Sequence, residues 1–399
     1  MNIEKQLQEL AQELKLTDYK FPDLFVKAGA IHNIADYLAQ NGWKKVSIVY
    51  DKNTFEAAGK HVQQVLKEAG FLTHGHLLPA DEHNQVIANE EALVQLLVDV
   101  PKTDDVLIAV GSGTIHDIVR FASYHLQIPF ISFPTAASVD GFTSKGAPII
   151  VRKVKKTVQT VSPIAVFADL HILQAAPKEM TAAGFGDILG KYTSLLDWKI
   201  SGLIGNEPYN ETAANLTKQA LELCVNHVEK IQKADQEGIK ILMEALLLSG
   251  LVMQLLNHSR PASGAEHHLS HYWEMHLLKT NQKQLLHGAK VGVATTIISD
   301  LYKQKKLELE KLLDKDTKYQ DAIRSHLDEI QKLIDDLPSS NQLRSLLKKI
   351  EGPSTIEELG IAQELVKQSL NEAYHLRDRC TGLLLINQIK ESELPYPFS

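Results

Sequence analysis

The chain has little of several features that mark secreted, nucleic-acid-binding or lipid-binding proteins. Only two cysteines, Cys224 and Cys380, occur in 399 residues. A framework of disulfides is therefore not implied, and a reducing compartment is favoured. Lysine and arginine (42) are outnumbered by aspartate and glutamate (49), which gives a formal net charge of −7. This balance argues against a general affinity for nucleic acid or anionic lipid, so an anionic ligand would need a local positive pocket.

Long hydrophobic runs are also missing. The longest, ALLLSGLVMQLL at residues 245–256, is shorter than the roughly 20 residues that a bilayer-spanning helix needs. The amino terminus, MNIEKQLQELAQELKL, mixes charges with leucines at helical spacing and lacks the apolar core of a secretory signal. We therefore expect a cytoplasmic protein with no membrane or nucleic-acid partner.

What the first half does contain is an alternation of two patterns. Short β-branched runs and amphipathic stretches follow one another at 46–50, 54–70, 106–110, 114–125 and 130–134. This order predicts parallel strands with helices packed on both faces of the sheet. Residues 147–170 then hold consecutive strand-like pieces, which suggests a hairpin that closes the first domain.

Strand signals disappear from about Pro177 onward, and helical patterns replace them. Apolar residues recur at three- and four-residue spacing over 211–234, 237–259 and 289–306, and in further stretches to about residue 390. We therefore predict an α/β domain at residues 1–176 followed by an all-α domain at 177–399. The segment 303–351 is rich in lysine, glutamate and aspartate, and we interpret its charges as solvated helix faces.

A glycine turn interrupts the first half after one of the predicted strands. VLIAVGSGTIHD places Gly111 and Gly113 between an apolar strand and a helix. Glycines there let the backbone approach a ligand, and the N–H groups at a helix start attract phosphate. The dinucleotide fingerprint has a third glycine where this chain has His116. A plain tight turn is therefore an equally good interpretation of the pattern alone.

Polar side chains also follow two other predicted strands. Asp51 ends the run at 46–50, where an acid can accept hydrogen bonds from a ribose. PTAASVDGFTS, at residues 134–144, contributes Thr135, Ser138, Asp140 and Ser144. Because the carboxyl ends of parallel strands line one crevice, all three segments are expected to face one ligand. The alternative for the third segment is a capped turn in which Ser138 and Asp140 bond their own backbone.

A histidine cluster stands in the second half, in SGAEHHLSHYWEMH. Its members are His267, His268, His271 and His276. His267 and His271 share a helix face, whereas His268 is turned about 100° away; His276 is expected at the surface. The spacing alone does not decide which of the two aligned histidines binds a metal, and a polar core histidine is the alternative for each.

Two segments offer partners for a metal-binding histidine. Asp187 lies in GFGDILGKYTS, and His287 lies in LLHGAK. One carboxylate and two imidazoles suit Zn²⁺, Ni²⁺ or Fe²⁺, and they leave coordination positions open for a substrate. Open positions indicate catalysis more than a structural site.

Together, PTAASVDGFTS, GFGDILGKYTS, SGAEHHLSH and HGAK occur here in the order of the iron-type alcohol dehydrogenase superfamily, which includes glycerol dehydrogenase and dehydroquinate synthase. Over roughly residues 20–300, the chain most closely resembles the glycerol-1-phosphate dehydrogenases of the Bacillus type. One departure is Ala289, where the superfamily commonly has glutamate. The resemblance implies a Rossmann-like amino-terminal domain, a helical carboxy-terminal domain, an active site in the cleft between them, and a homodimer.

The resemblance also implies an activity: hydride transfer between NAD(H) and the pair dihydroxyacetone phosphate and sn-glycerol 1-phosphate, assisted by one divalent metal, with zinc or nickel expected before iron. The alternatives are a glycerol or polyol dehydrogenase acting on an unphosphorylated substrate, a dehydroquinate synthase, and a non-catalytic metal- or nucleotide-binding regulator. Asp51 favours NAD over NADP, because its charge would repel a 2′-phosphate.

Site residues carry over onto the matching positions. The metal is assigned to Asp187, His267 and His287, and the substrate to Asp140, Asp187 and His271. His271 is also the candidate proton relay, because an imidazole titrates near neutral pH. Arg260 and Lys191 are candidates for binding the substrate phosphate. NAD(H) is expected to contact Asp51, Gly111, Gly113, Thr114, Ile115, His116, Asp117, Thr135, Ala136, Ala137, Ser138 and Ser144.

Overall fold

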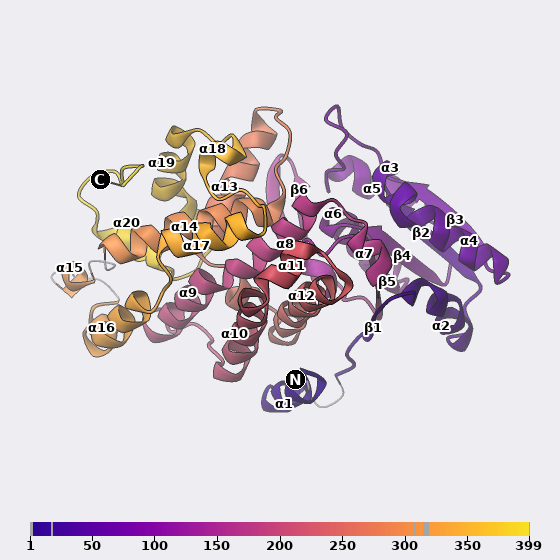
Figure 1. The fold of residues 1–399 in the computed structure, drawn as a ribbon, viewed down its shortest axis with the longest axis horizontal. Helices are drawn as coiled ribbons and strands as arrows, with labels where there is room; N and C mark the ends of the chain where they lie inside the picture. Colours follow the sequence, from indigo (N-terminus) through magenta and orange to yellow (C-terminus); the bar gives the residue numbers. More distant parts are fainter. Residues whose placement is uncertain (1–2, 17–18, 306–308, 314–318, 399) are drawn as a thin grey trace.

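The computed structural model describes residues 3–16, 19–305, 309–313 and 319–398 of the chain. Figure 1 shows a sheet-containing half built from the earlier residues beside a helical half built from the later ones. All strands of the described residues lie before Leu170. The predicted fold class, an α/β part followed by an all-α part, is therefore confirmed. The domain boundary between residues 176 and 177 stays a prediction.

The main sheet has six parallel strands in the order β1-β8-β5-β4-β2-β3. Their bounds are β1 (Asp23–Lys27), β2 (Lys45–Tyr50), β3 (Leu72–Leu77), β4 (Val106–Gly111), β5 (Phe130–Pro134) and β8 (Ala165–Asp169). The three predicted runs form β2, β4 and β5, which are almost entirely buried. Continuous apolar runs of this kind suit a parallel sheet that is covered on both faces.

Helices cover both faces of this sheet, as predicted. The helical segments between its strands are η1 (Ala30–Asn33), α2 (Ile34–Gln40), α3 (Lys52–Thr54), η2 (Phe55–Gly59), α4 (Lys60–Glu68), α5 (Glu90–Asp99), α6 (Gly113–Leu126) and η3 (Gly141–Thr143). On one face Leu107 packs with α5 and α6, and on the other Ile108 packs with α2 and α4. Successive strand residues point to opposite faces, so β4 contributes to two cores at once.

The hairpin expected over residues 147–170 is only partly correct. β6 (Gly146–Val151) and β7 (Val154–Gln159) do form an antiparallel pair of their own. The third strand-like piece is β8, which joins the main sheet between β1 and β5. All five residues of β8 are buried, and such an apolar segment is more stable inside a covered parallel sheet than in an exposed hairpin.

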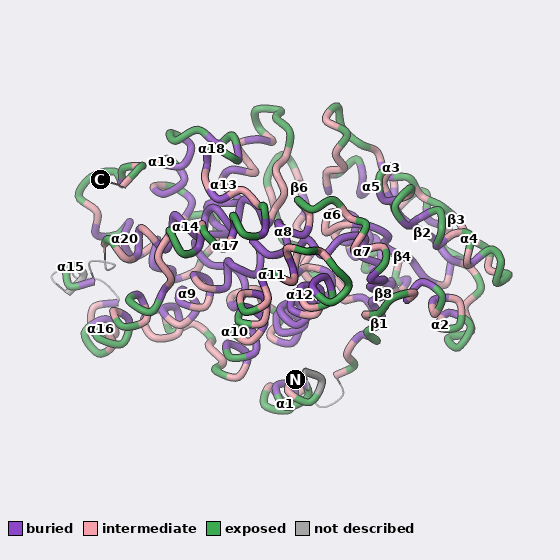
Figure 2. Tube along the Cα trace, in the orientation of Figure 1, coloured by how far each residue is buried: buried purple, intermediate pink, exposed green. Residues whose placement is uncertain are grey.

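The helical half contains one long apolar helix, α12. Its helical segments are α7 (Leu170–Gln174), α8 (Lys178–Leu189), α9 (Lys191–Leu203), α10 (Glu211–Asn226), α11 (Val228–Lys233), α12 (Gln236–Leu256), η4 (Arg260–Ala262), α13 (Ala265–Lys279), α14 (His287–Lys305), α15 (Glu310–Leu313), α16 (Gln320–Asp335), α17 (Ser340–Lys349), α18 (Ile356–Leu359), α19 (Gln363–Glu372), η6 (Ala373–Leu376) and α20 (Gly382–Ile389). By length and hydropathy α12 could cross a membrane, but 78% of its most apolar window is buried inside the protein. It is therefore a core helix (Figure 2).

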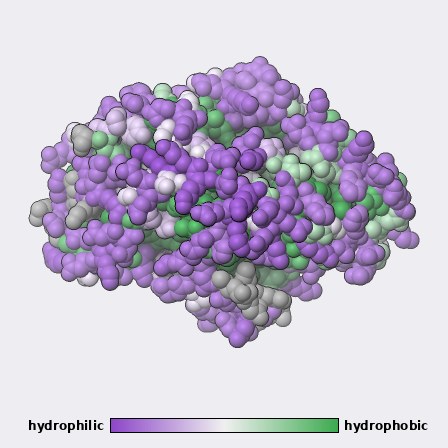
Figure 3. Space-filling view, in the orientation of Figure 1, coloured by the Kyte–Doolittle hydropathy of each residue, from purple (hydrophilic) through white to green (hydrophobic). Residues whose placement is uncertain are grey.

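Two segments complete the helical half. The first helix, α1 (Ile3–Glu13), packs against it through Leu7 and Leu10, although α1 precedes the sheet in sequence. In the charged segment, α16 and α17 bury isoleucines and leucines and expose most of their charged side chains, as predicted. Part of that prediction, at 306–308 and 314–318, lies outside the described residues. The face seen in Figure 3 is mostly hydrophilic.

Candidate metal centre and nucleotide cleft

A cleft of about 1180 Å³ has walls from both halves of the molecule. The sheet half contributes residues at the carboxyl ends of β2, β4 and β5, among them Asp51, Ser112 and Thr135. The helical half contributes His267 on α13 and His287 at the start of α14. The predicted nucleotide segments and the histidine cluster therefore face the same space.

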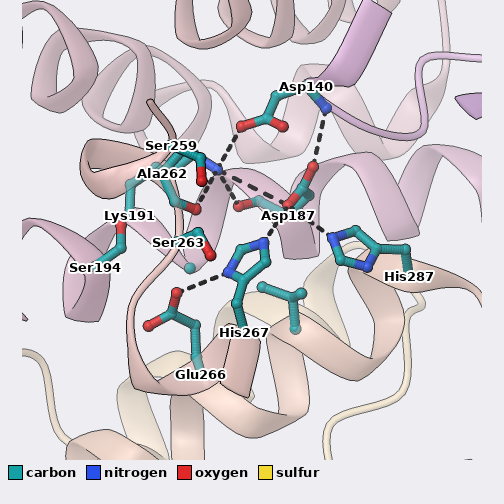
Figure 4. A network of polar contacts seen from close by, with 12 residues as sticks. Asp140, Asp187, Lys191, Ser194, Ser259, Ala262, Ser263, Glu266, His267 and His287 are labelled. Atoms are coloured by element: carbon teal, nitrogen blue, oxygen red, sulfur yellow. Dashed lines mark hydrogen bonds and ion pairs between the residues drawn. The ribbon is translucent and has the colours of Figure 1, made fainter. Parts of the chain in front are cut away.

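The three predicted metal ligands lie close together in this structure. The Nε2 atom of His267 is 3.6 Å from Oδ1 of Asp187, and Nε2 of His287 is 3.8 Å from the same oxygen (Figure 4). One ligand atom from each residue lies within 4.8 Å of the other two. In a tetrahedral site with bonds of about 2.0–2.2 Å, ligand atoms are about 3.3–3.6 Å apart. The cluster is therefore close to the size that a divalent ion requires.

Hydrogen bonding leaves the inward-facing atoms of this cluster available. Oδ1 of Asp187 is buried without a hydrogen-bond partner, while Oδ2 accepts the Asp140 N–H at 2.9 Å. His267 Nδ1 lies 2.7 Å from Oε1 of Glu266. A hydrogen bond from Nδ1–H to that carboxylate fixes the tautomer and frees Nε2 for a metal. Sequence reasoning missed Glu266, although a carboxylate next to a ligand histidine is a recognisable signal.

The charge state of the cluster favours a cation. Burial alone would raise the pKa of Asp187, but Lys191 and the two histidines hold it well below its usual range. Burial lowers the pKa of His287 to about 3, so this ring is neutral. Burial also opposes protonation of His267, but the carboxylates of Asp187 and Glu266 outweigh it and raise its pKa. Positive charge is thus stabilised at the point that the three side chains share.

A close crossing of α8 and α14 brings Asp187 and His287 together. A Cβ atom added to Gly288 would lie 1.8 Å from the Ala183 carbonyl oxygen, and one added to Gly186 would lie 2.3 Å from that of Gly288. Only glycines allow the two backbones to approach this closely. The GFGD and HG sequences therefore set the distance between the Asp187 carboxylate and the His287 imidazole.

Replacing Gly288 by alanine is expected to weaken both the fold and metal binding. The new Cβ must push α14 away from backbone atoms of α8, at a cost of about 1–3 kcal/mol or more. Urea unfolding and metal titration of the purified variant measure the two effects. Gly292→Ala is the comparison on the same helix, because its Cβ meets chiefly the side chain of Leu347, at 2.9 Å. An equal effect of both substitutions would contradict the argument.

The start of α13 is anchored by a carboxylate from another helix. Asp197 on α9 accepts the Ala265 N–H through Oδ2 at 2.8 Å, and its Oδ1 accepts Tyr302 O–H and the Gly382 N–H, each at 2.8 Å. Burial, reinforced by Glu266, raises the pKa of Asp197 to about 7. This network fixes the helix end that carries His267.

A buried lysine joins the two acidic residues of the site. Lys191 Nζ is 2.7 Å from Oδ2 of Asp140 and 3.8 Å from Oδ1 of Asp187. The Lys191 side chain is fully buried and does not line the cleft. Its charge is already matched by carboxylates, so these contacts do not support the expectation that Lys191 binds a substrate phosphate. Asp140 does line the cleft and also accepts a hydrogen bond from Ser249, at 2.8 Å.

His271 lies beside the cluster rather than in it. Its ring centroid is 6.0 Å from that of His267 and 5.8 Å from that of His287. Burial lowers its pKa well below 6.5, and the role of His271 as a proton relay stays a prediction. His271, Glu274 and His287 could form a second metal group, but Glu274 is bound by Lys155 at 2.7 Å and Lys290 at 3.1 Å. The Asp187 group therefore fits a metal better.

The predicted nucleotide residues divide into two groups. Eight line the cleft: Asp51, Gly113, Thr114, Asp117, Thr135, Ala136, Ser138 and Ser144. Four others do not: Gly111, Ile115, His116 and Ala137. Ile115 packs in the core between the sheet and α5 and α6, and Ala137 packs in the core of the helical half. The His116 ring bonds Ser112 O and Ser132 Oγ, each at 2.8 Å. Their side chains are structural, so a cofactor contact through them is not supported.

The turn before α6 leaves the helix start open to the cleft. Ser112 precedes α6 and makes no side-chain cap, so N–H groups near Gly113 are available to an anion. Asp51 instead caps its own short helix by accepting the Thr54 N–H at 2.7 Å. The capped turn considered for Ser138 and Asp140 does not form, because Ser138 Oγ has no partner and Asp140 bonds Lys191 and Ser249.

The predicted phosphate ligand Arg260 points elsewhere. Its Nε bonds Oε2 of Glu207 at 2.7 Å, and it does not line the cleft. Two other arginines line the cleft: Arg120, which is paired with Asp117 at 2.9 Å, and Arg377, which the sequence reasoning missed. Arg377 lies more than a hundred positions after His267 and belongs to no motif, so no local pattern pointed to it.

The remaining two histidines of the cluster have no place in the metal group. His268 is fully buried, neither ring nitrogen has a hydrogen-bond partner, and burial holds its pKa well below 6.5. His276 is half-buried and does not line the cleft. The helical rotation that separates His268 from His267 was read correctly from the spacing.

Comparison with known proteins gives one consistent family. Residues 25–177 match the model of the iron-containing alcohol dehydrogenases. A glycerol-1-phosphate dehydrogenase [NAD(P)+] of Geobacillus thermodenitrificans is 47% identical, covering 93% of each chain, and one of Bacillus velezensis is 46% identical, covering 92% of this chain and 91% of that one. A probable glycerol dehydrogenase of Sinorhizobium meliloti has the same fold, with a TM-score of 0.65, 18% identity, and 92% and 95% coverage.

Proposed function

This chain belongs to the glycerol-1-phosphate dehydrogenase family, and from that membership and the cleft we propose that it interconverts dihydroxyacetone phosphate and sn-glycerol 1-phosphate with NAD(H). The observation that carries the proposal is the group of Asp187, His267 and His287 in the wall of a cleft that also receives the uncapped start of α6. The cleft thus combines a group that can hold a metal with a helix start that can bind phosphate. This combination suits hydride transfer between a nucleotide cofactor and a carbon whose oxygen is polarised by the metal.

Asp187, His267 and His287 would hold the divalent metal, which supplies Lewis acidity toward the substrate oxygen when it is bound. The buried, unpartnered Oδ1 of Asp187 and the two inward Nε2 atoms support this assignment. Two imidazoles and one carboxylate suit zinc or nickel better than metals that prefer oxygen ligands alone, such as magnesium or calcium. Glu266 keeps His267 in the tautomer that presents Nε2.

The nucleotide would lie against the glycine turn and the segment after β5. The N–H groups near Gly113 and Thr114 would bind its pyrophosphate, and Thr135, Ser138 and Ser144 would contact the rest. Ser138 Oγ is buried with no partner, which supports a ligand contact there. The Asp51 carboxylate supports NAD rather than NADP, because it would repel a 2′-phosphate.

Asp140 and His271 would contact the substrate. Asp140 lines the cleft and is held by Lys191 and Ser249. His271 is neutral, and its Nε2 faces the Arg377 guanidinium at 3.4 Å. Since a guanidinium only donates, Nε2 accepts and the ring proton is on Nδ1, 3.6 Å from Glu274.

We infer that the protein is a cytoplasmic homodimer. Cys224 and Cys380, which are both among the described residues, form no disulfide, and this suits a reducing compartment.

A comparison of two carbonyl substrates tests this function. With NADH and added metal, kcat/KM for dihydroxyacetone phosphate is expected to exceed that for dihydroxyacetone by about 100-fold or more, because each charge-assisted bond to phosphate contributes about 1.5–3 kcal/mol. Chiral analysis of the product is expected to give sn-glycerol 1-phosphate. Equal or better turnover of dihydroxyacetone would instead identify a polyol dehydrogenase with the same metal group.

A further inference from the structure

Of the two arginines that line the cleft, Arg377 has no acidic partner among the described residues, whereas Arg120 is paired with Asp117. Arg377 follows η6 and lines the cleft, half-buried, with its guanidinium bonded to Ser259 Oγ at 3.3 Å and to His271 Nε2 at 3.4 Å. Within the described residues, no carboxylate forms an ion pair with it. Burial lowers its pKa, and no acidic neighbour opposes that shift. A guanidinium that is partly removed from water and has no anion beside it is destabilising unless a ligand supplies one.

The other cations of the cleft are paired with a carboxylate, lie over an aromatic ring or are exposed. Arg120 is paired with Asp117 at 2.9 Å, while Lys155 and Lys290 share Glu274. The remaining two among the described residues are Lys145, which lies over the Tyr19 ring, and Lys283, which is exposed. A phosphate at Lys155 and Lys290 would have to compete with the Glu274 carboxylate. Arg377 needs no such displacement.

One serine hydroxyl, that of Ser259, contacts the Arg377 guanidinium, and a second, that of Ser263, lines the same cleft. Ser259 Oγ accepts from Arg377 and, at 2.9 Å, from Arg379. Ser263 lines the same cleft, its Oγ is buried with no partner, and its carbonyl accepts from Arg379 at 2.6 Å. A planar guanidinium with nearby hydroxyl donors is the combination that binds a phosphate group.

The position of this group suits the substrate of the proposed function. Arg377 contacts His271, whose ring lies 6.0 Å and 5.8 Å, centroid to centroid, from the rings of His267 and His287. A three-carbon substrate is short. If its carbonyl oxygen lies at the metal group, its phosphate therefore lies close to that group as well. Lys155 and Lys290 are also near this place, because the Glu274 carboxylate that they share lies 3.6 Å from His271 Nδ1, but their charges are already matched by that carboxylate.

We propose that Arg377, together with the hydroxyls of Ser259 and Ser263, binds the phosphate of the substrate and so selects dihydroxyacetone phosphate over dihydroxyacetone. The proposal rests on the proposed function and adds the residues that set its specificity. It replaces the earlier candidates Arg260 and Lys191, whose charges are matched by Glu207, Asp140 and Asp187.

The test is a comparison of Arg377→Met with the unmodified enzyme on both substrates. We expect kcat/KM for dihydroxyacetone phosphate to fall roughly 100-fold, mainly through KM, and that for dihydroxyacetone to change less than about twofold. Inorganic phosphate, used as a competitive inhibitor of dihydroxyacetone reduction, is expected to lose about tenfold or more in affinity. Arg377→Lys keeps the charge but not the planar fork, and an intermediate loss of about tenfold is expected.

Lys283→Met is the matched control, because it removes an exposed cation from the same cleft and is expected to leave all three measurements unchanged. Metal content and the unfolding midpoint of each variant report on its structure, and Arg377→Lys serves for the comparison should Arg377→Met not fold. Equal losses on both substrates, or an undiminished preference for the phosphorylated one, overturn the role of Arg377 alone. An unmodified enzyme that does not distinguish the two substrates overturns the proposed function as well.

Discussion

Replacing Asp187 by asparagine is expected to give a folded protein that does not retain a stoichiometric metal ion and has lost nearly all activity. The side-chain oxygen of asparagine can still accept the Asp140 N–H, as Oδ2 of Asp187 does at 2.9 Å. That orientation turns the NH₂ group toward His267 and His287, and an amide nitrogen that carries two protons is not a metal ligand. Changes to groups behind the ligands typically cost 10–100-fold in affinity or activity, so losing a ligand should cost more than about 100-fold.

Metal content after gel filtration and kcat/KM with dihydroxyacetone phosphate measure the effect of Asp187→Asn. Asp104→Asn is a suitable control, because Asp104 is buried but bonds Ser47 and His74 outside the cleft. Chelation of the unmodified enzyme should reproduce the loss, and separate addition of zinc and nickel should show which ion restores turnover. A fully metallated and active Asp187→Asn enzyme would remove Asp187 from the metal group.

The fold was predictable where burial left a simple pattern. β4 and β5 lie inside a sheet covered on both faces, so their sequences are continuous apolar runs bounded by turns. The edge strands β1 and β3 read DLFVK and LTHGHL, and their mixed polar and apolar residues follow their partial exposure. The pairing of β1 with β8 and of β3 with β2 depends on tertiary contacts, so it cannot be predicted from the local sequence.

The site was predictable to the extent that its chemistry lies in short motifs. GFGD and HG carry both a ligand and the glycine that allows α8 and α14 to approach, so local sequence and geometry coincide. The spacing could not decide between His267 and His271, because both share a helix face; the family resemblance chose His267, and its hydrogen bond to Glu266 supports that choice. The substrate cation could not be found in this way, because whether an arginine is paired depends on residues far away in sequence, such as Glu207 for Arg260.

Replacing Lys191 by methionine should cause the largest loss of stability. Lys191 is fully buried between Asp140 and Asp187, and its pKa is raised because those carboxylates outweigh burial. Methionine keeps the length of the side chain but leaves two buried carboxylates without their cation. Removing one partner of a buried ion pair costs about 3–5 kcal/mol, which urea unfolding of the metal-free protein at neutral pH would measure. Lys199→Met, on the same helix but in partly exposed pairs, should cost less than about 1 kcal/mol.

The stability difference between the unmodified protein and Lys191→Met should change with pH in a stated direction. A simple loss of packing would not cause such a change. In the unmodified protein, the lowered pKa of Asp187 contributes stability above the unfolded carboxyl pKa of about 3.9, and that contribution is lost as the pH falls. Without the lysine, both carboxyls should have raised pKa values, so the folded variant binds protons more tightly than the unfolded chain and loses stability as the pH rises above about 4. The gap between the two proteins should therefore be widest near neutral pH, shrink on acidification, and narrow when saturating metal returns positive charge to Asp187. A gap that is constant with pH and metal would show that Lys191 contributes packing rather than charge.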